Sequence, residues 1–412
     1  MVWLNGGPGC SSLGGLITEH GPIVLSRNET QGVILNPYTW ATHANMLYIE
    51  GPPGVGFSYC REQLGDPNFV CSSDDDLASS ATLDALRSFF HKFPAFLHRD
   101  MYITGESYAG VYVPTLAKRV VESELMEMVN FKGWAVGDPC TDDRSQMDEI
   151  DFSPEFSLRH GIIDEILYSR LLNCVEDQSS EVCKKARYQF ELAQGGHRAK
   201  GSPAILDPYN VYGISHHTGW DLAHTYLNRD DVKEAIHVAG TPRANVADSW
   251  SFCSEINYQS LYDACNYAPK AGAISMLDIY RELAPKLTNV LLYNGDVDPS
   301  VDAFGSQRAA YALGFGVLQG GEWRPWTFDQ HGAGANFVSE KFEGFGQSLT
   351  VDAVGEQLGG YVVNFANNFT FLTLHGSGHM TPQYKPQASL EMFKRFLENA
   401  PYADPIVYPE DL

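Results

Sequence analysis

A serine set between glycines is the first candidate for chemistry in this sequence. The run at 105–110 reads GESYAG and contains the pattern G-x-S-x-G, with Ser107 at its centre. It lies between a predicted strand at 101–104 and a predicted helix from about 108 to 126, the context in which a sharp turn lifts such a serine clear of a sheet. The helix N-terminus would favour a negative charge developing beside the hydroxyl. A tight turn whose serine merely caps the helix is the less favoured interpretation.

Two more residue types are needed, because a serine hydroxyl reacts near neutral pH only when a base takes its proton and a carboxylate orients that base. Asp298 and His379 each follow a predicted strand, and the order Ser, Asp, His is that of α/β-hydrolases. Asp296 competes with Asp298 as the orienting acid, and His375 competes with His379 as the base. Chemistry alone leaves both choices open.

The elements that must position these residues alternate between strands and helices. Apolar runs predict strands at 1–4, 46–50, 101–104, 132–136, 289–293 and 369–374. Helices are expected after Asp74, Asp75 and Asp76, whose carboxylates suit a helix N-terminus, and at 108–126, 273–287 and 386–398. This alternation predicts an α/β fold whose mostly parallel sheet carries helices on both faces.

The strand and helix rhythm stops after residue 139 and gives way to polar, cysteine-bearing, helix-like sequence. Such a change of character predicts an insertion into the fold. We therefore expect a first part of the core at 1–139, a mainly helical insertion over the active site at 140–240, and a second part of the core at 241–412.

Composition excludes several classes of protein. The chain has 412 residues, 44% of them hydrophobic, which predicts a globular protein. Its 28 Lys and Arg against 51 Asp and Glu give a formal net charge of −23, which argues against nucleic acid as a partner. No apolar run reaches the length of a membrane span, and no targeting segment is visible. We expect neither a metal nor a cofactor, since ligand spacings and phosphate-binding loops are missing.

Eight cysteines without a close CxxC pair favour disulfide bonds over a zinc or redox site. Asn28 and Asn368 each begin a glycosylation sequon. Together with the acidic charge, these features predict a glycoprotein of the secretory route, either secreted or vacuolar or lysosomal.

Four runs spread over essentially the whole chain resemble the serine carboxypeptidase family: WLNGGPGCSS at 3–12, GESYAG at 105–110, NGDVD at 294–298 and GSGHM at 376–380. The resemblance implies an α/β-hydrolase fold with a helical insertion over the site. It also implies a catalytic triad of Ser107, Asp298 and His379, and an oxyanion hole formed by the backbone N–H groups of Gly7 and Tyr108.

The same resemblance implies a site for the terminal carboxylate of the substrate, made of Trp3, Asn5, Gly6, Glu19 and Glu106. Two glutamates and a substrate carboxylate cannot all be ionised cheaply in one small cleft, so at least one would hold a proton. The implied function is release of C-terminal amino acids from peptides and proteins through an acyl-enzyme, at acidic pH.

Two other functions compete with this one. A family-like acyltransferase would use the same chemistry with a different acceptor, although two glutamates suited to a peptide carboxylate argue against it. A non-catalytic scaffold or protective partner would not need a complete triad. The sequence leaves the oligomeric state open, a homodimer included.

Disulfide pairing follows partly from the resemblance, which assigns Cys10 to Cys253. Cys60 with Cys71 and Cys174 with Cys183 would close short loops, and Cys140 with Cys265 follows only by elimination.

Two departures from the family pattern stand out. Asp138 occupies a position where the family commonly has Asn, and we expect this to alter the hydrogen bonds of its turn without affecting the triad. Met1 stands just before the run at 3–12, where family members have further strands and a signal peptide, so the chain is expected to lack both.

Overall fold

The structure is a computed structural model that describes residues 1–25, 32–66, 68–146, 153–174, 179–194, 206–214, 219–239, 249–265, 272–330 and 355–409. Asn28, one of the two predicted glycosylation sites, lies outside these ranges.

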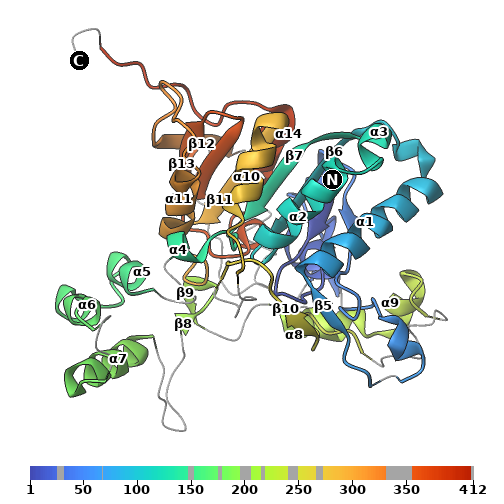
Figure 1. Ribbon diagram of the computed structural model, residues 1–412, viewed down its shortest axis with the longest axis horizontal. Helices are drawn as coiled ribbons and strands as arrows, with labels where there is room; N and C mark the ends of the chain where they lie inside the picture. Colours follow the sequence, from blue (N-terminus) through green and yellow to red (C-terminus); the bar gives the residue numbers. More distant parts are fainter. Residues whose placement is uncertain are drawn as a thin grey trace.

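An eight-stranded sheet forms the centre of the molecule (Figure 1), in the order β12-β13-β14-β11-β7-β6-β1-β4. The strands from β14 to β4 are parallel, whereas β13 pairs antiparallel with both β14 and β12. Their bounds are β1 (Val2–Leu4), β4 (Leu47–Tyr48), β6 (Asp100–Glu106), β7 (Asn130–Gly137), β11 (Asn289–Gly295), β12 (Arg324–Gln330), β13 (Gly355–Phe365) and β14 (Phe369–Leu374). The predicted α/β class with a mostly parallel sheet is confirmed.

Helices cover both faces of this sheet because successive strand side chains point to opposite sides. In β6, Ile103 packs into the core under α1 (Asp75–Lys92) and α2 (Ala109–Val121), while Tyr102 packs into the core under α14 (Pro386–Glu398). α10 (Leu277–Leu283) and α11 (Ala303–Ala312) contribute to the same core as α1 and α2.

Strand register brings the carboxyl ends of five strands to one edge of the sheet. The facing residues at this edge are Leu4 and Gly105, Glu106 and Gly137, Tyr293 and Gly137, and Gly295 and Leu374. The segments that follow these strands carry Asn5, Ser107, Asp138, Asp298 and His379. Ligand and catalytic sites of open α/β sheets lie at this edge.

Two predicted helices are shorter than expected. The helix expected at 108–126 is α2 followed by a separate turn, α3 (Leu125–Met128). The helix expected at 273–287 begins at Leu277 and gives way to a 3₁₀ turn, Ala284–Lys286, whose second residue is Pro285. Proline lacks the N–H that an α-helix interior requires.

The region between β7 and β11 holds α4 (Asp143–Gln146), α5 (Pro154–Arg159), α6 (Glu165–Leu172), α7 (Glu181–Ala193), β8 (Leu206–Asp207), β9 (Asn210–Ile214), α8 (Trp220–Leu227), α9 (Asp230–Ala235) and β10 (Asn257–Gln259). In Figure 1, α5, α6 and α7 form a group set apart from the sheet, and α8 and α9 lie at the opposite side of the molecule. α8 packs on the π-helix Gly15–Glu19. Apart from α4, which packs on α11, the helices of this region therefore fall into two groups.

The remaining short elements are β2 (Ile23–Leu25), β3 (Val33–Leu35), β5 (Ser72–Asp74) and α13 (Thr381–Tyr384). Among the described residues, no helix combines the length and the apolar character that crossing a membrane requires.

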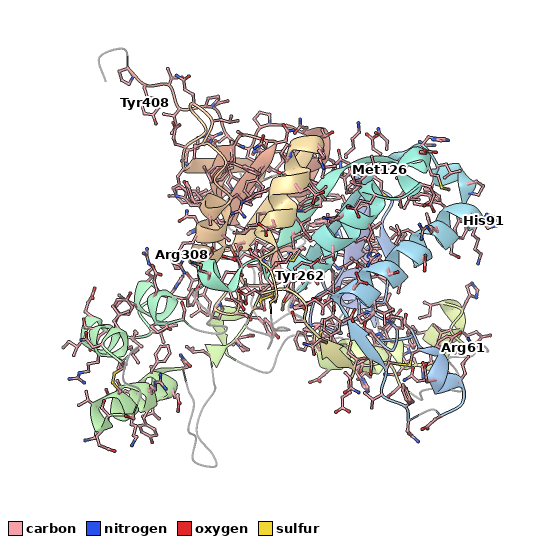
Figure 2. The ribbon with its side chains drawn as sticks, viewed as in Figure 1. Arg61, His91, Met126, Tyr262, Arg308 and Tyr408 are labelled. Carbon is pink, nitrogen blue, oxygen red and sulfur yellow. A yellow bond between two sulfur atoms is a disulfide. The ribbon has the colours of Figure 1, made fainter. Side chains whose placement is uncertain are left out.

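One arginine connects the insertion to the core. Arg308 of α11, labelled in Figure 2, donates from Nε to the carbonyl oxygen of Ser145 at 2.8 Å and from Nη1 to Oε2 of Glu155 in α5 at 2.8 Å. Four disulfide bonds add covalent links, and their pairs are those named from the sequence: Cys10–Cys253, Cys60–Cys71, Cys140–Cys265 and Cys174–Cys183.

Candidate active site

Ser107 occupies the turn between β6 and α2 with φ of 63°. Its backbone N–H donates to the carbonyl oxygen of Gly137 at 2.9 Å, and its carbonyl oxygen accepts from the N–H of Gly110 and of Cys140 at 2.8 and 3.0 Å. The residues on either side are buried, whereas Ser107 is half-buried. The strained turn thus holds the serine away from the core at the N-terminus of a 13-residue helix.

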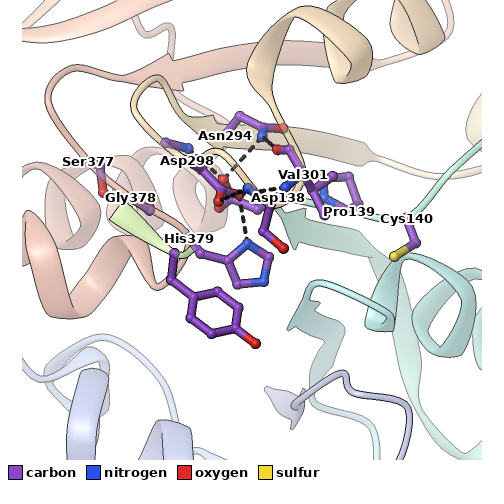
Figure 3. Close-up of polar contacts among 12 residues, drawn as sticks. Asp138, Pro139, Cys140, Asn294, Asp298, Val301, Ser377, Gly378 and His379 are labelled. Atoms are coloured by element: carbon purple, nitrogen blue, oxygen red, sulfur yellow. Dashed lines mark hydrogen bonds and ion pairs between the residues drawn. The ribbon is translucent and has the colours of Figure 1, made fainter. Parts of the chain in front are cut away.

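Asp298 and His379 form a buried pair, shown in Figure 3. His379 Nδ1 lies 2.7 Å from Asp298 Oδ2. The backbone N–H groups of Ser300 and Val301 donate to Oδ1 and Oδ2 of Asp298 at 2.8 and 3.2 Å. Three donors therefore fix this carboxylate.

The competing acid and base also pair with each other, but at the surface. Asp296 Oδ2 lies 2.8 Å from Nδ1 of His375, whose side chain is 56% exposed. The side-chain hydrogen bond to Asp296 raises the pKa of His375. The two acids and two histidines thus separate into one buried and one exposed pair.

The glycine run after β1 lies directly against the serine turn. A Cβ added to Gly6 would come within 2.5 Å of the backbone nitrogen of Tyr108, which leaves space for glycine alone. The backbone N–H of Gly9 donates to the hydroxyl of Tyr112 in α2 at 3.2 Å. Cys10, at the end of the run, is bonded to Cys253. The run is therefore fixed at several points beside Ser107.

Two glutamates meet next to this run. Asn5 Nδ2 donates to Glu106 Oε1 at 2.9 Å, and Asn5 Oδ1 accepts from Trp3 Nε1 at 2.8 Å. Glu19 and Glu106 are buried and share a hydrogen bond. Burial raises the pKa of Glu19 to about 7. Burial and the neighbouring Glu19 raise the pKa of Glu106 well above its ordinary value, so this pair holds a proton where isolated glutamates would not.

The chain is similar to known proteins over nearly its whole length. The serine carboxypeptidase family model matches residues 1–399. The chain belongs to the serine carboxypeptidase family. It is 30% identical to mouse lysosomal protective protein over 456 residues, covering 98% of this chain and 85% of that protein. It is 29% identical to the serine carboxypeptidase ctsa-4.1 of Caenorhabditis elegans, covering 98% and 85%.

A solved structure shows the same fold. The prohormone-processing carboxypeptidase Kex1(Δ)p of Saccharomyces cerevisiae superposes with a TM-score of 0.70 and 22% identity, over 97% of this chain and 82% of that one. The protein is accordingly a serine-type carboxypeptidase, a hydrolase, and the acyltransferase and scaffold alternatives are not favoured.

Asp138 lies nearer to Asp298 and His379 than expected from the sequence. We expected Asp138 to alter the hydrogen bonds of its own turn, but one oxygen of its carboxyl group also lies within 4.8 Å of an oxygen of Asp298 and a nitrogen of His379. The register that aligns β7 with β11 brings the turns after both strands together. The sequence places these two residues 160 positions apart, and only sheet pairing makes them neighbours.

The side chains of Asp138, Asp298 and His379 offer atoms that could coordinate a metal ion. One oxygen each of Asp138 and Asp298 and one nitrogen of His379 lie within 4.8 Å of one another. Zinc holds its ligand atoms about 2.0 Å away in a tetrahedron, which separates them by roughly 3.3 Å. The 2.7 Å contact between His379 and Asp298 is too short to enclose such an ion.

Asp75 does not cap the helix as the sequence predicted, but has another role. Asp74 caps α1 by accepting from the N–H of Leu77 at 2.7 Å, as expected. Asp75 is buried instead, and its Oδ1 lies 2.9 Å from the hydroxyl of Tyr108 and 2.6 Å from that of Tyr258. It therefore anchors the side chain of the residue that follows the serine.

Tyr209 contacts His379, and the sequence did not predict this contact. Its carbonyl oxygen accepts from the backbone N–H of His379 at 2.8 Å, and the two rings lie 5.2 Å apart. Tyr209 belongs to the turn between β8 and β9, so the insertion touches the histidine directly. No motif in the sequence marks this residue.

Proposed function

We propose that Ser107, Asp298 and His379 are the catalytic triad of this carboxypeptidase. Ser107 Oγ attacks the carbonyl carbon of the last peptide bond while His379 takes the hydroxyl proton. With Nδ1 directed at Asp298, Nε2 is the nitrogen that accepts this proton and passes it to the leaving amino group. Water then attacks the acyl-enzyme and releases the shortened peptide. The buried His379–Asp298 contact of 2.7 Å is the observation that carries the proposal.

The oxyanion hole in this proposal consists of the backbone N–H groups of Gly7 and Tyr108. Two observations support it. The close approach of Gly6 to the nitrogen of Tyr108 sets the glycine run against the serine turn. The Asp75 hydrogen bond to the Tyr108 hydroxyl fixes the position of the second donor. Donors held in place before the reaction stabilise the developing oxyanion without reorganisation.

We further propose that Trp3, Asn5, Gly6, Glu19 and Glu106 bind the terminal carboxylate of the substrate. A negatively charged group binds beside two glutamates only if a proton remains among the three acids. The raised pKa values of Glu19 and Glu106 supply that proton below about pH 7. Peptide hydrolysis should therefore be favoured at acidic pH.

An acidic compartment of the secretory route, vacuolar or lysosomal, suits this pH preference, and secretion is the alternative. Four disulfide bonds support an oxidising route. Asn368 is exposed at the turn between β13 and β14, a position that a glycan can reach. The mouse relative is by name lysosomal.

We also keep the three-part division, with core segments at 1–139 and 241–412 and the insertion at 140–240. The contact of Tyr209 with His379 supports a position of the insertion over the site. In this arrangement the insertion selects the side chains on either side of the cleaved bond.

Substitution of the nucleophile tests the proposal. Ser107→Ala should lower kcat by about 10⁴-fold or more while peptide affinity and thermal stability remain close to wild type. A fluorophosphonate should label the wild type at Ser107 and leave the variant unlabelled. Ser123→Ala, just after the same helix, is the matched control and should keep full activity and labelling. Peptide hydrolysis by Ser107→Ala at a near wild-type rate would exclude the assignment.

A further inference from the structure

Asp138 is a buried acid with one well-satisfied oxygen. It follows β7 with φ of 45°, and its backbone N–H donates to the carbonyl oxygen of Tyr293 at 2.8 Å. Its Oδ1 accepts from the backbone N–H of Gly295 at 2.8 Å and from Nδ2 of Asn294 at 3.1 Å (Figure 3). These contacts orient the carboxyl group through Oδ1 and do not involve its second oxygen, Oδ2.

Oδ2 of Asp138 is buried, and no donor among the described residues reaches it. One oxygen of the Asp138 carboxyl group lies within 4.8 Å of an oxygen of Asp298, and the two side chains interact electrostatically. Asp298 accepts from His379 Nδ1 and from two backbone N–H groups. Two carboxyl oxygens in contact repel each other unless one of them carries hydrogen.

The groups that face Asp138 do not neutralise a second negative charge. Asp298 after β11 and Glu106 at the end of β6 are acids that act on its charge. Tyr293 of β11 faces it as a buried phenol, and His379 after β14 lies within 4.8 Å. Burial and the charge of Asp298 raise the pKa of Asp138 well above its ordinary value, in agreement with the geometry.

We propose that Asp138 is a positioning residue of the triad: its carboxyl group keeps a proton on Oδ2 and donates it to Asp298, which holds Asp298 toward His379. This inference rests on the proposed triad. The two acids together then carry one negative charge. When rising pH removes the shared proton, the donor becomes a second acceptor, Asp298 is repelled from its position, and kcat falls.

Asp138→Asn replaces the titratable carboxyl group with an amide that donates a hydrogen bond at every pH. The amide oxygen can accept from Asn294 and Gly295, the amide nitrogen can donate to Asp298, and asparagine tolerates a positive φ. The expected result is a decrease in kcat of no more than about tenfold at pH 5, with the upper limb of the kcat profile shifted by at least about one pH unit to higher pH. KM should change little.

The substrate in this test is a blocked peptide ester, because it lacks the terminal carboxylate that involves Glu19 and Glu106. Asp142→Asn is the matched control, a buried acid four positions further that accepts from the hydroxyl and N–H of Ser145. Its pH profile should superimpose on that of the wild type. A role of Asp138 in stability alone would lower Tm and leave the upper limb unchanged.

The wild type provides an independent measurement through the proton resonance of His379 Nδ1–H. This resonance should move with pH over the range of the upper limb, and the movement should be missing in Asp138→Asn. No movement in the wild type would overturn the proposal even if the variant failed to fold. Coincident upper limbs, or a folded Asp138→Asn inactive at every pH, would also overturn it. If Ser107→Ala is inactive in the same assays, those results reject only the role of Asp138, whereas an active Ser107→Ala rejects the triad itself.

Discussion

Two pairs of buried carboxyl groups lie at the same edge of the sheet and differ in their hydrogen-bond donors. Glu106 accepts a hydrogen bond from Asn5 and shares another with Glu19. Oε2 of Glu19 has no partner among the described residues. Asp298 accepts hydrogen bonds from two backbone N–H groups and from His379. Donors stabilise an ionised carboxylate, and their lack favours the protonated form. The two pairs therefore differ in the number of hydrogen bonds that stabilise a negative charge.

Among variants of these two pairs, the largest effect should come from removing one member of the glutamate pair. Glu106→Ala should lower kcat/KM for a peptide about 100-fold, because the proposed hydrogen-bond partner of the substrate carboxylate is lost and Asn5 Nδ2 loses its acceptor. The C-terminal amide of the same peptide should lose much less, since it carries no such carboxylate. Glu122→Ala, an exposed glutamate after α2, is the control. Equal losses on both substrates would remove the carboxylate from the explanation.

A pH profile of activity tests whether the proton of the Glu19–Glu106 pair takes part in substrate binding. Peptide kcat/KM should fall as pH rises through about 7, the pKa of Glu19, because in our proposal the protonated form donates to the substrate carboxylate. The amide substrate should keep its activity to higher pH. Glu19→Gln should flatten the peptide profile, since an amide donates at every pH. If peptide and amide profiles superimpose in the wild type, the shared proton has no part in binding.

The same raised pKa makes stability depend on pH. The pKa of Glu19 is about 7 in the folded protein against an ordinary 4.5, so between these values the native state binds more protons than the unfolded state. The free energy of unfolding should therefore fall as pH rises from 4.5 to 7, by about 3 kcal/mol from this group. Thermal unfolding of wild type, Glu19→Gln and the control Glu122→Gln at several pH values measures it. A wild-type slope unchanged in Glu19→Gln would contradict the assignment.

The smallest effect concerns communication between the two pairs. Glu106 acts on Asp138 only as a more distant charge. The effects of Glu106→Gln and Asp138→Asn on peptide kcat/KM at pH 5 should therefore add to within about 0.5 kcal/mol in the double variant. A larger departure from additivity would mean that both pairs share a single proton and that the distinction between them fails.

The sequence was sufficient for the residues that local patterns mark. The G-x-S-x-G run predicted the turn at Ser107, and the terminal helix at 386–398 and the strand at 369–374 have the predicted bounds. In contrast, Asp138 meets Asp298 only through the pairing of β7 with β11, and Tyr209 reaches His379 only through the path of the insertion. Contacts of this kind depend on tertiary structure, and no local pattern encodes them.

Asp75 illustrates the same limit on a smaller scale. Three consecutive aspartates before a helix all suit its N-terminus, and the pattern does not distinguish them. Burial does, because only Asp75 faces Tyr108 and Tyr258. The same residue type at adjacent positions therefore caps a helix in one case and anchors Tyr108, beside the turn at Ser107, in the other.

The disulfide between Cys140 and Cys265 has a consequence for how this enzyme can diverge. It joins the two ends of a stretch with a sequence separation of 125. Cys140 also binds the carbonyl oxygen of Ser107 through its backbone N–H. Tyr209, Cys253 and Tyr258 lie in this stretch and contact the site. Segments between these contacts can change in sequence and length while the ends stay together. Substrate preference can therefore evolve inside the covalent loop while the distances among Ser107, Asp298 and His379, which lie outside it, are preserved.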